Sequence, residues 1–306
     1  MTEIVAAAFR QKTKKSKWIE EGVRWGIFLC ALASVLTTFG IIFVLAKEAI
    51  PFFREVSLVD FLFGTKWNAL ILPRSFGVLP LLMGTMLIVL GAGLIALPVG
   101  LASAIYLSEF ASQRVRQTVK PILEILAGIP TVVYGYFALT GITPILKSFN
   151  DEIPVFNALS ASIVVAVMIL PMVASLCDDA LKAVPRSLRD GGYALGSTKT
   201  EVSLKIVVPA ALSGIVASFV LAFSRAIGET MAVTLAAGGT PKMTLNPLES
   251  IQTMTAFIVQ VATGDIEHGS ISYHSLYAVG GLLFLITLAA NLLSYKILKK
   301  YREEYE

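Results

Sequence analysis

Residues 77–107 read GVLPLLMGTMLIVLGAGLIALPVGLASAIYL, and this uncharged run decides the fold. An α-helix rises 1.5 Å per residue, so about 20 apolar residues span a hydrocarbon core about 30 Å thick. Lipid offers no hydrogen-bond partners to backbone N–H and C=O groups, so the run has to be helical where it crosses a membrane. Pro98 lies within it and predicts an interruption of the helix.

Five further apolar runs bring the predicted number of membrane spans to six. They cover residues 25–46, 121–146, 159–176, 210–237 and 276–298. The composition agrees, because 56% of the residues are hydrophobic, 15% are charged and the mean hydropathy is +0.76. A soluble domain carries roughly 25% charged residues. The sequence therefore predicts an all-α integral membrane protein with six transmembrane helices.

The distribution of Lys and Arg predicts the orientation of these spans, since basic residues are enriched in cytoplasmic segments. With the N-terminus in the cytoplasm, 18 of the 25 basic residues fall on the cytoplasmic side, six fall outside and Arg225 lies within a span. We therefore expect a multi-pass protein of the cytoplasmic (inner) membrane with both termini in the cytoplasm. The net charge of +4 follows from this topology and gives no reason to expect a nucleic-acid partner.

This topology divides the chain into consecutive parts. The predicted parts are a basic cytoplasmic N-terminus (1–24), a first, peripheral transmembrane helix (25–46), an external segment (47–76), a core of five transmembrane helices (77–298) that contains a cytoplasmic loop (177–208), and a cytoplasmic tail (299–306). The first run is too long for the apolar core of a cleaved signal peptide, so an uncleaved helix is expected. Cys30 and Cys177 lie in or at the end of spans and are interpreted as small packing residues rather than a disulfide.

The two long external segments differ in composition. The first carries aromatic side chains and predicts amphipathic structure on the outer surface, with the rings at the membrane interface. These aromatic residues are Phe52, Phe53, Phe61, Phe63 and Trp67. The second, residues 238–273, is rich in Gly, Thr, Pro and Ser, and His268 and His274 lie near its end. Two His residues without nearby thiols are a weak metal signal, so we expect solvated loop residues and no metal site.

Nucleotide-binding and catalytic motifs are missing from the sequence. No G-x-x-x-x-G-K-[ST] occurs, so the chain is not expected to hydrolyse ATP in the P-loop manner. Residues 91–96, GAGLIA, formally match G-x-G-x-x-A, but they lie within a span, where small residues allow close helix packing. A membrane enzyme would need a catalytic constellation, and His268 and His274 with Asp265 and Glu267 nearby do not supply one. We therefore expect a chain that is not an enzyme and binds no cofactor.

The cytoplasmic loop carries the most specific pattern, DDALKAVPRSLRDGGYALGSTKTEVSLKIVVPAAL at residues 178–212. Asp178 and Asp179 can cap the start of a helix, and a second amphipathic helix is predicted over 188–195. Gly196 is expected to end that helix, and the Ser-Thr pair that follows can cap the next segment. The result is two helices joined by a glycine turn that project into the cytoplasm, a shape suited to docking in a groove of another protein.

This loop resembles the EAA loop of the permease subunits of ATP-binding-cassette (ABC) importers. That pattern has an acidic residue and two small ones, three residues, Gly, nine residues, then Ile-x-Leu-Pro. The matching positions here are Asp190, Gly191, Gly192, Gly196, Ile206, Val208 and Pro209. Asp replaces Glu, glycines replace alanines and Val replaces Leu, changes that keep the charge sign and the small size. The resemblance implies a type I ABC-importer permease fold, in which the helix before Gly196 is the coupling helix that seats in a cleft of an ATPase subunit.

Ionisable residues inside the spans form a second candidate site. A charge at the bilayer centre costs about 2.5–3.5 kcal/mol on insertion scales and marks function by default. Arg225 and Glu229 are four positions apart in span five, which would place them on one helical face where they neutralise one another. We interpret them as lining a substrate pathway, with the guanidinium able to bind an oxyanion in a bidentate manner; the alternative is a structural ion pair.

Glu124 is a third ionisable residue, near the inner end of span three, where it either neutralises basic residues or forms an inner gate. Span three is expected to bend after it, because Gly128, Pro130 and Gly135 follow. Glu109, at the cytoplasmic end of span two, is interpreted as an ordinary interface residue.

Two further stretches narrow the resemblance, RAIGETMAV at 225–233 and AGIPTVVYG at 127–135. Together with the loop, they resemble the permeases of phosphate-specific importers, the C-type subunit more than its A-type companion. The resemblance implies that Arg225, Glu229 and Glu124 line the pathway of inorganic phosphate. It also implies the partners, which are a second homologous permease subunit, two ATPase subunits and an external phosphate-binding protein.

Other functions stay open at this point. One is a permease for another oxyanion, such as sulfate or molybdate, or the A-type subunit. Another is a secondary transporter or channel without an ATPase, which would need no coupling loop. Glu229 beside Arg225 favours phosphate, because phosphate near neutral pH keeps a hydroxyl that can donate to a carboxylate, whereas sulfate does not.

Overall fold

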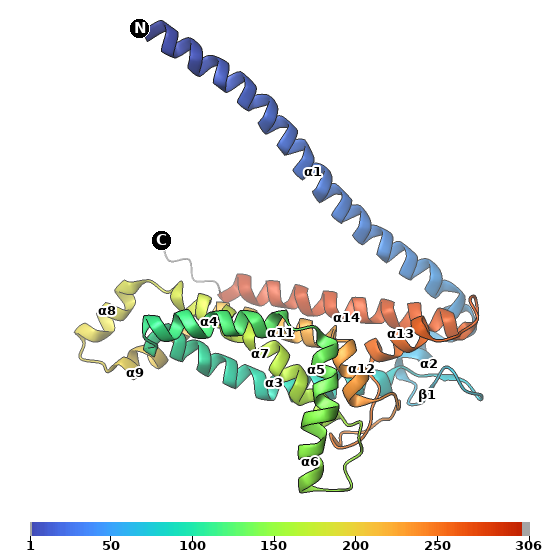
Figure 1. Ribbon diagram of the computed structural model, residues 1–306. Coiled ribbons are helices and arrows are strands. Elements are labelled where there is room, and N and C mark those ends of the chain that lie inside the picture. The colour runs from blue at the N-terminus through green and yellow to red at the C-terminus, as the bar shows by residue number, and fades with distance from the viewer. Residues whose placement is uncertain (1, 302–306) are drawn as a thin grey trace.

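Most of the described chain is helical, and the helices form an elongated body from which one helix departs (Figure 1). The computed structural model describes the backbone of residues 2–301 and the side chains of residues 18–296. In chain order the elements are α1 (Thr2–Glu55), α2 (Leu58–Phe63), β1 (Trp67–Asn68), β2 (Ser75–Phe76), α3 (Leu79–Ile105), the π-helical η1 (Tyr106–Phe110), α4 (Gln113–Gly128), α5 (Thr131–Phe137), the π-helical η2 (Ala138–Ile142), α6 (Thr143–Phe149), α7 (Ala158–Lys182), α8 (Arg186–Ala194), α9 (Lys199–Val202), the π-helical η3 (Ser203–Val207), α10 (Val208–Ala210), α11 (Leu212–Ile227), α12 (Met231–Ala237), α13 (Met254–Thr263) and α14 (Ile271–Tyr301).

Four helices in the described part of the chain are long and apolar enough to cross a membrane. They are Trp18–Glu55, Leu79–Phe110, Ala158–Lys182 and Ile271–Lys296. The number rises to six when each of two bent pairs counts as one span, Gln113–Gly128 with Thr131–Phe149 and Lys199–Ala210 with Leu212–Ile227. The predicted all-α membrane fold is therefore confirmed, and its third and fifth spans are bent rather than straight.

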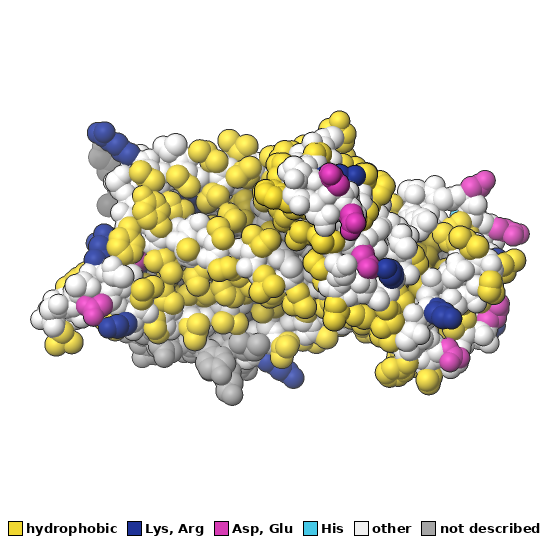
Figure 2. Space-filling model, turned by 90° about the horizontal axis from the view of Figure 1, so that it is seen from below, with side chains coloured by type: hydrophobic (Ala, Val, Ile, Leu, Met, Phe, Trp, Pro, Cys, Tyr) yellow, Lys and Arg dark blue, Asp and Glu magenta, His cyan; other side chains and the backbone are white. Residues whose placement is uncertain are grey.

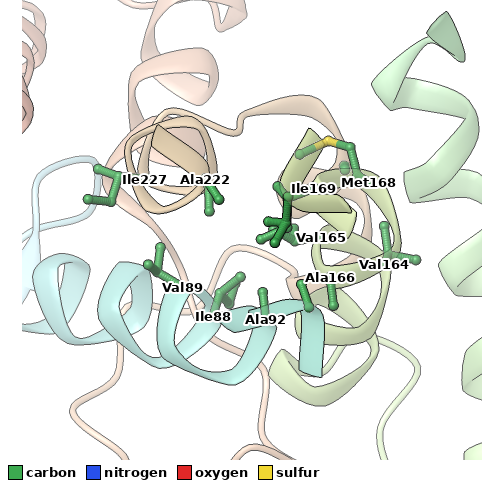
Figure 3. Close-up of a cluster of buried hydrophobic side chains, with 14 of the residues drawn as sticks. Ile88, Val89, Ala92, Val164, Val165, Ala166, Met168, Ile169, Ala222 and Ile227 are labelled. Atoms are coloured by element: carbon green, nitrogen blue, oxygen red, sulfur yellow. The ribbon is translucent and has the colours of Figure 1, made fainter. Parts of the chain in front are cut away.

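The helices α3, α7 and α11 pack together in the core (Figure 3). Ile88 and Ala92 of α3 face Val165 and Ile169 of α7, and each of these side chains is 1% exposed or less. Ala222 of α11 closes the cluster from the side. These positions alternate large and small apolar side chains, which lets the three helices interdigitate.

Small residues of α3 let it approach its neighbours closely. A Cβ added at Gly93 would lie 2.5 Å from Cε1 of Phe223, and one added at Gly100 would lie 2.6 Å from Cγ1 of Val173. The interpretation of GAGLIA as a packing surface is therefore confirmed. The interruption expected at Pro98 is wrong, because α3 continues through this residue; neighbouring helices can support a membrane helix where proline removes a hydrogen bond.

Span three bends where the sequence predicts it. α4 ends at Gly128, α5 begins after Pro130, and the two halves meet at 90°. The hydroxyl of Tyr134 donates to the carbonyl of Leu126 at 2.7 Å across the bend and so satisfies a carbonyl at the end of α4. Gly135 does not contribute to the bend, because it lies inside α5 and packs closely against α12.

The first long external segment is folded into the protein instead of lying on its surface. Phe52, Phe61 and Trp67 are buried, with exposed fractions of 5% or less, while Phe53 and Phe63 stay exposed. The ring of Trp67 packs edge-on against a ring of α13, with 4.8 Å between the centroids. The expected belt of interfacial rings is therefore wrong for the buried three, because these rings pack edge-to-face in a closed cluster.

The second long external segment is also partly buried, where the sequence predicts a solvated loop. α13 lies within it, and every residue from Ile251 to Phe257 is buried. The backbone N–H of Met254 donates to Oγ1 of Thr85 in α3 at 3.1 Å. Hydroxyl groups of this kind satisfy backbone groups inside the protein, so a Thr-rich segment can enter the core.

The histidines and cysteines lie apart from one another. His268 is exposed, whereas Nδ1 of His274 lies 3.0 Å from the carbonyl oxygen of Glu48 in α1. The residues with described side chains contain no group of three or more His, Cys, Asp or Glu that could hold a metal ion. Cys177 is buried, Cys30 is exposed on α1, and both thiols are free.

α1 leaves the body at a steep angle, and its apolar side chains between Trp18 and Val44 are largely exposed (Figure 1). On the face of the body seen from below, hydrophobic side chains are widespread, and charged ones lie at both ends and in a group right of the centre (Figure 2). The wide apolar surface fits a protein that lies largely in hydrocarbon.

Candidate functional site

The coupling helix predicted from the EAA-like loop is α8, and it ends at the predicted glycine. Gly196 has a φ of +80°, in the left-handed region that favours glycine. Its N–H donates to the carbonyl of Tyr193 at 2.9 Å, and the N–H of Ser197 donates to the carbonyl of Gly192 at 3.2 Å. These two bonds form a Schellman motif, which satisfies carbonyls at the end of a helix.

The start of the loop differs from the prediction. α7 extends to Lys182, so Asp178 and Asp179 lie in its last turns and do not begin a helix. Asp178 is 3% exposed and pairs with Lys182, while Asp179 lies 3.5 Å from Nζ of Lys120 in α4. Acidic side chains are unfavourable near a helix C-terminus, and these two cations offset that cost.

The two glycines of the EAA-like pattern have different surroundings. Gly192 is buried, and a Cβ there would lie 2.6 Å from Cδ1 of Ile206 and 3.0 Å from Cγ2 of Val202. Gly191 faces open space, with nothing within 4 Å of an added Cβ. α8 therefore packs directly on the segment that follows it, and Ile206 supplies the contact.

The segment after Gly196 begins with a capping box, which confirms Thr198 as a cap. Oγ1 of Thr198 accepts from the N–H of Glu201 at 3.3 Å, and Oε2 of Glu201 accepts from the N–H of Thr198 at 3.1 Å. The hydrogen bonds from Thr198, followed by those from Lys205, lower the pKa of Glu201 to about 2. Pro209 lies further on in α10, just before the 69° bend into α11.

The outer face of α8 offers a surface for a partner. Asp190 is exposed, as are the apolar side chains Leu188, Tyr193 and Leu195, the last of them 88% exposed. Exposed apolar side chains beside a charge are typical of a docking surface. The residues of the EAA-like pattern therefore separate into Asp190 and Gly191 on the outer face and Gly192 and Ile206 on the inner one.

One ion pair of this region is missing from the sequence-based prediction. Nη2 of Arg189 in α8 lies 2.8 Å from Oε1 of Glu109 in η1, and the two side chains are 16% and 7% exposed. Arg189 also donates to the carbonyls of Val184 and Leu181, at 2.7 and 2.8 Å. Glu109 is thus no ordinary interface residue, and its partner lies 80 positions away in the chain.

Arg225 and Glu229 do not lie on one continuous helix, which corrects the prediction. α11 ends at Ile227 and α12 begins at Met231, so the break at Gly228–Thr230 separates the two side chains. Glu229 is 8% exposed; its Oε1 accepts from the N–H of Ala232 at 3.1 Å, and its carbonyl accepts from the hydroxyl of Thr255. The carboxylate therefore binds the buried N–H of Ala232 in the first turn of α12, and no ion pair joins it to Arg225 among the described residues.

Arg225 lines a cavity of about 270 Å³ between α4, α7 and α11. The other ionisable side chains that line it are Glu124, Arg116, Lys120 and Asp178. Arg225 and Glu124 therefore line one cavity and Glu229 lies outside its lining, while the role of all three in a substrate pathway stays a prediction. Arg116, Lys120 and Asp178 are additional members that the sequence did not single out.

The cavity holds three cationic and two anionic side chains. Arg116 donates to backbone carbonyls, Lys120 pairs with Asp179, and Asp178 pairs with Lys182. Within the described side chains, neither Arg225 nor Glu124 has a hydrogen-bond or ion-pair partner. A guanidinium and a carboxylate without other partners in one cavity can bind an oxyanion that also carries a hydroxyl, since the first donates and the second accepts.

A family model described as "Binding-protein-dependent transport system inner membrane component" matches residues 96–303. This is more than half of the chain, so the protein belongs to this family of ABC-importer permeases. Its members are membrane subunits, the ATPase being a separate subunit, so the chain is a multi-pass permease of the inner membrane and not an enzyme. A secondary transporter without an ATPase is excluded, and an ATPase and a binding protein are its partners.

Particular relatives refine this assignment. The probable ABC transporter permease protein YqgH of Bacillus subtilis is 34% identical over 86% of this chain and 86% of its own. The phosphate transport system permease protein PstC of Xylella fastidiosa (strain 9a5c) is 33% identical over 76% of each chain, and that of Mesorhizobium japonicum is 33% identical over 74% of each. The predicted resemblance to C-type phosphate permeases is confirmed.

A solved structure supports the fold. A chain of the MetNI methionine ABC transporter, in an inward-facing conformation, matches 74% of this chain and 95% of its own with a TM-score of 0.55. At 18% sequence identity this likeness concerns the fold alone. It agrees with the type I permease fold that the loop pattern implies.

Proposed function

We propose that this chain is the C-type permease subunit that carries inorganic phosphate into the cell. The observation that carries the proposal is its 33% identity to relatives named PstC over 76% and 74% of the chain. The inner cavity supports it, because the unpaired guanidinium of Arg225 can bind two oxygens of a phosphate at once.

In the proposed assembly, this subunit pairs with a second, homologous permease subunit. Two ATPase subunits bind the outer faces of the coupling helices, and an external phosphate-binding protein docks at the opposite end. Closure of the ATPase dimer on ATP moves α8 and opens the pathway outward, and hydrolysis returns it to the inward-facing state. The chain's termini both lie in the cytoplasm in this arrangement.

Within the pathway, Glu124 takes the role that the sequence suggested for Glu229. Glu124 lines the same cavity as Arg225, whereas the carboxylate of Glu229 is engaged with α12. Phosphate near neutral pH keeps a hydroxyl that can donate to Glu124 while its other oxygens accept from Arg225. Sulfate has no such hydroxyl, so the arrangement favours phosphate over sulfate or molybdate.

Uptake of labelled anions by the reconstituted importer tests the proposal. We expect the wild-type assembly to accumulate phosphate and not sulfate. Arg225→Ala should lower phosphate uptake roughly 10- to 100-fold, the range for losing hydrogen bonds to a charged group. Uptake by Arg225→Lys should lie between that of the wild type and that of Arg225→Ala, because lysine keeps the positive charge but lacks the planar guanidinium that binds two oxygens at once. Sulfate uptake by the wild type would refute the substrate, and normal uptake by an assembled Arg225→Ala importer would reduce Arg225 to a structural role.

A further inference from the structure

We infer that the π-helical segment η1 receives the movement of the coupling helix, and that the Glu109–Arg189 ion pair transmits it. The inference rests on the proposed function in one respect, the use of phosphate as the transported anion. It adds two positioning residues, neither of which belongs to the EAA-like pattern or to the proposed pathway.

The ion pair joins α8 rigidly to the end of span two. Besides the 2.8 Å contact from Nη2, the Nε of Arg189 lies 3.3 and 3.4 Å from the two oxygens of Glu109. Nη1 of Arg189 donates to the carbonyl of Val184, and Nη2 donates also to that of Leu181, both at the end of α7. The guanidinium group of Arg189 is planar and nearly all of its N–H donors are engaged. α8 therefore cannot shift without moving Glu109 or breaking these hydrogen bonds.

Side chains from two further elements, α4 and α9, also hold η1. Arg116 of α4 donates to the carbonyls of Leu107 and Ser108, the latter at 2.8 Å. The ammonium of Lys199 in α9 lies 5.1 Å from the centroid of the Phe110 ring, within the range of a cation–π contact. Four of the five residues of η1 therefore meet side chains from α4, α8 and α9.

The geometry of η1 suits it to transmit movement. π-helical segments are rare and frequently occur at functional sites. η1 continues directly from α3, which packs in the core against α7 and α11. A change in η1 can therefore turn or shift α3 without unfolding it.

Arg116 links this movement to the cavity. Its guanidinium binds the carbonyls of η1, and the same side chain lines the cavity that contains Arg225 and Glu124. Displacement of α8 therefore passes through Arg189 to Glu109, then through η1 and Arg116 to the wall of the pathway. Each step of this route is a direct contact between described residues.

The experiment compares phosphate carried per ATP hydrolysed in proteoliposomes that contain the complete importer. Glu109→Gln, Arg189→Gln and the double variant are each assembled with the ATPase, the second permease and the binding protein. Residues that lie on a coupling route change the coupling by amounts equivalent to roughly 2- to 30-fold, so we expect a decrease of that size in each single variant. The double variant should lose no more than either single one, because all three remove the same contact.

Arg189→Lys keeps the importer testable if a buried unpaired charge prevents assembly of the Gln variants. Lysine retains the positive charge opposite Glu109 but cannot bind both Glu109 and the two carbonyls. We expect it to assemble with the ATPase and to carry about twofold less phosphate per ATP, the low end of the range for a residue on a coupling route. An unchanged ratio in this variant, or in an assembled Glu109→Gln importer, overturns the inference.

Glu48→Gln serves as the control, because it removes an acidic side chain that lies 3.7 Å from His274, far from η1 along the chain. Its ratio should equal that of the wild type. ATP hydrolysis stimulated by the binding protein is measured in the same samples, and the Glu109→Gln and Arg189→Gln variants should lose this stimulation. If the wild type is stimulated but carries no phosphate, the proposed substrate is wrong while the role of the ion pair is still tested by the stimulation.

Discussion

Glu229 lies in the break of span five, where its Oε1 accepts from the N–H of Ala232. Glutamine keeps an acceptor oxygen at this position, so Glu229→Gln should retain phosphate uptake, whereas Glu229→Ala leaves the first turn of α12 without its acceptor. The loss of such a capping interaction costs about 0.5–2 kcal/mol, and thermal unfolding of the purified protein in detergent should report it.

The opposite outcome is informative for Glu229. If an assembled Glu229→Gln importer loses uptake while its unfolding temperature is unchanged, the charge itself serves in passage, and Glu229 turns toward the cavity in another state. Glu229→Asp provides a control, because it keeps the charge and shortens the reach to α12.

Single residues differ in how far the sequence exposes their roles. Arg225 is found by a general rule, since a charge within an apolar run has to serve a purpose. Glu109 follows no such rule: it lies at a span end, where charges are common, and its partner Arg189 is 80 positions away. Only the packing of α8 against η1 brings these two side chains together, and no local spacing encodes that contact.

At the scale of elements, the coupling helix depends on one of its two glycines. A Cβ at Gly192 would meet Ile206 and Val202, so Gly192→Ala should destabilise the protein by about 1–3 kcal/mol through overpacking. Gly191 has open space, and alanine there should stabilise α8 by about 0.5–1 kcal/mol. Thermal unfolding of the two purified variants side by side checks this difference in sign, and equal effects would contradict the packing of α8 on η3.

The capping box of α9 gives a prediction on pH. The pKa of Glu201 is lowered to about 2 from its usual 4.5, so the stabilisation is complete above pH 4.5 and is lost as the pH falls toward 2. Hydrogen exchange of the α9 amides, corrected for the intrinsic rate, should therefore be constant between pH 8 and pH 5. Thr198→Ala should raise the exchange rate of these amides a few-fold above that of the wild type at every pH in this range. A difference from the wild type that appears only at low pH would contradict the role of the capping box.

The elements themselves divide into those with a local signal and those without. Long apolar runs predicted the spans, and Gly128 with Pro130 predicted the 90° bend. The break at Gly228–Thr230 was missed, because apolar residues continue on both sides and the closing partner, Thr255, comes from α13. α13 was missed for a related reason. The residues that flank it have the composition of a loop, and the burial of α13 depends on its contacts with Thr85 and Trp67, which lie far away in the sequence.

At the scale of the whole molecule, α8 and α9 lie at one end of the body and α2, β1 and α13 at the other (Figure 1). The basic residues of the sequence favour the α8 end as the cytoplasmic one. In the proposed assembly, the exposed apolar face of α8 then meets the ATPase, and the α13 end meets the binding protein. Both assignments depend on one orientation of the chain in the membrane, which a labelling experiment can measure.

Two exposed leucines mark the two ends, Leu195 after α8 and Leu245 between α12 and α13, with exposed fractions of 88% and 76%. In a variant that carries Cys30→Ser and Cys177→Ala, we introduce Leu195→Cys or Leu245→Cys and treat intact cells with a membrane-impermeant thiol reagent. Leu245→Cys should be labelled from outside, whereas Leu195→Cys should be labelled only in inside-out vesicles. The reverse pattern would refute the cytoplasmic placement of the loop.

In inside-out vesicles that also contain the ATPase subunit, labelling of Leu195→Cys should fall, because docking covers α8; undiminished labelling would mean that the ATPase binds elsewhere.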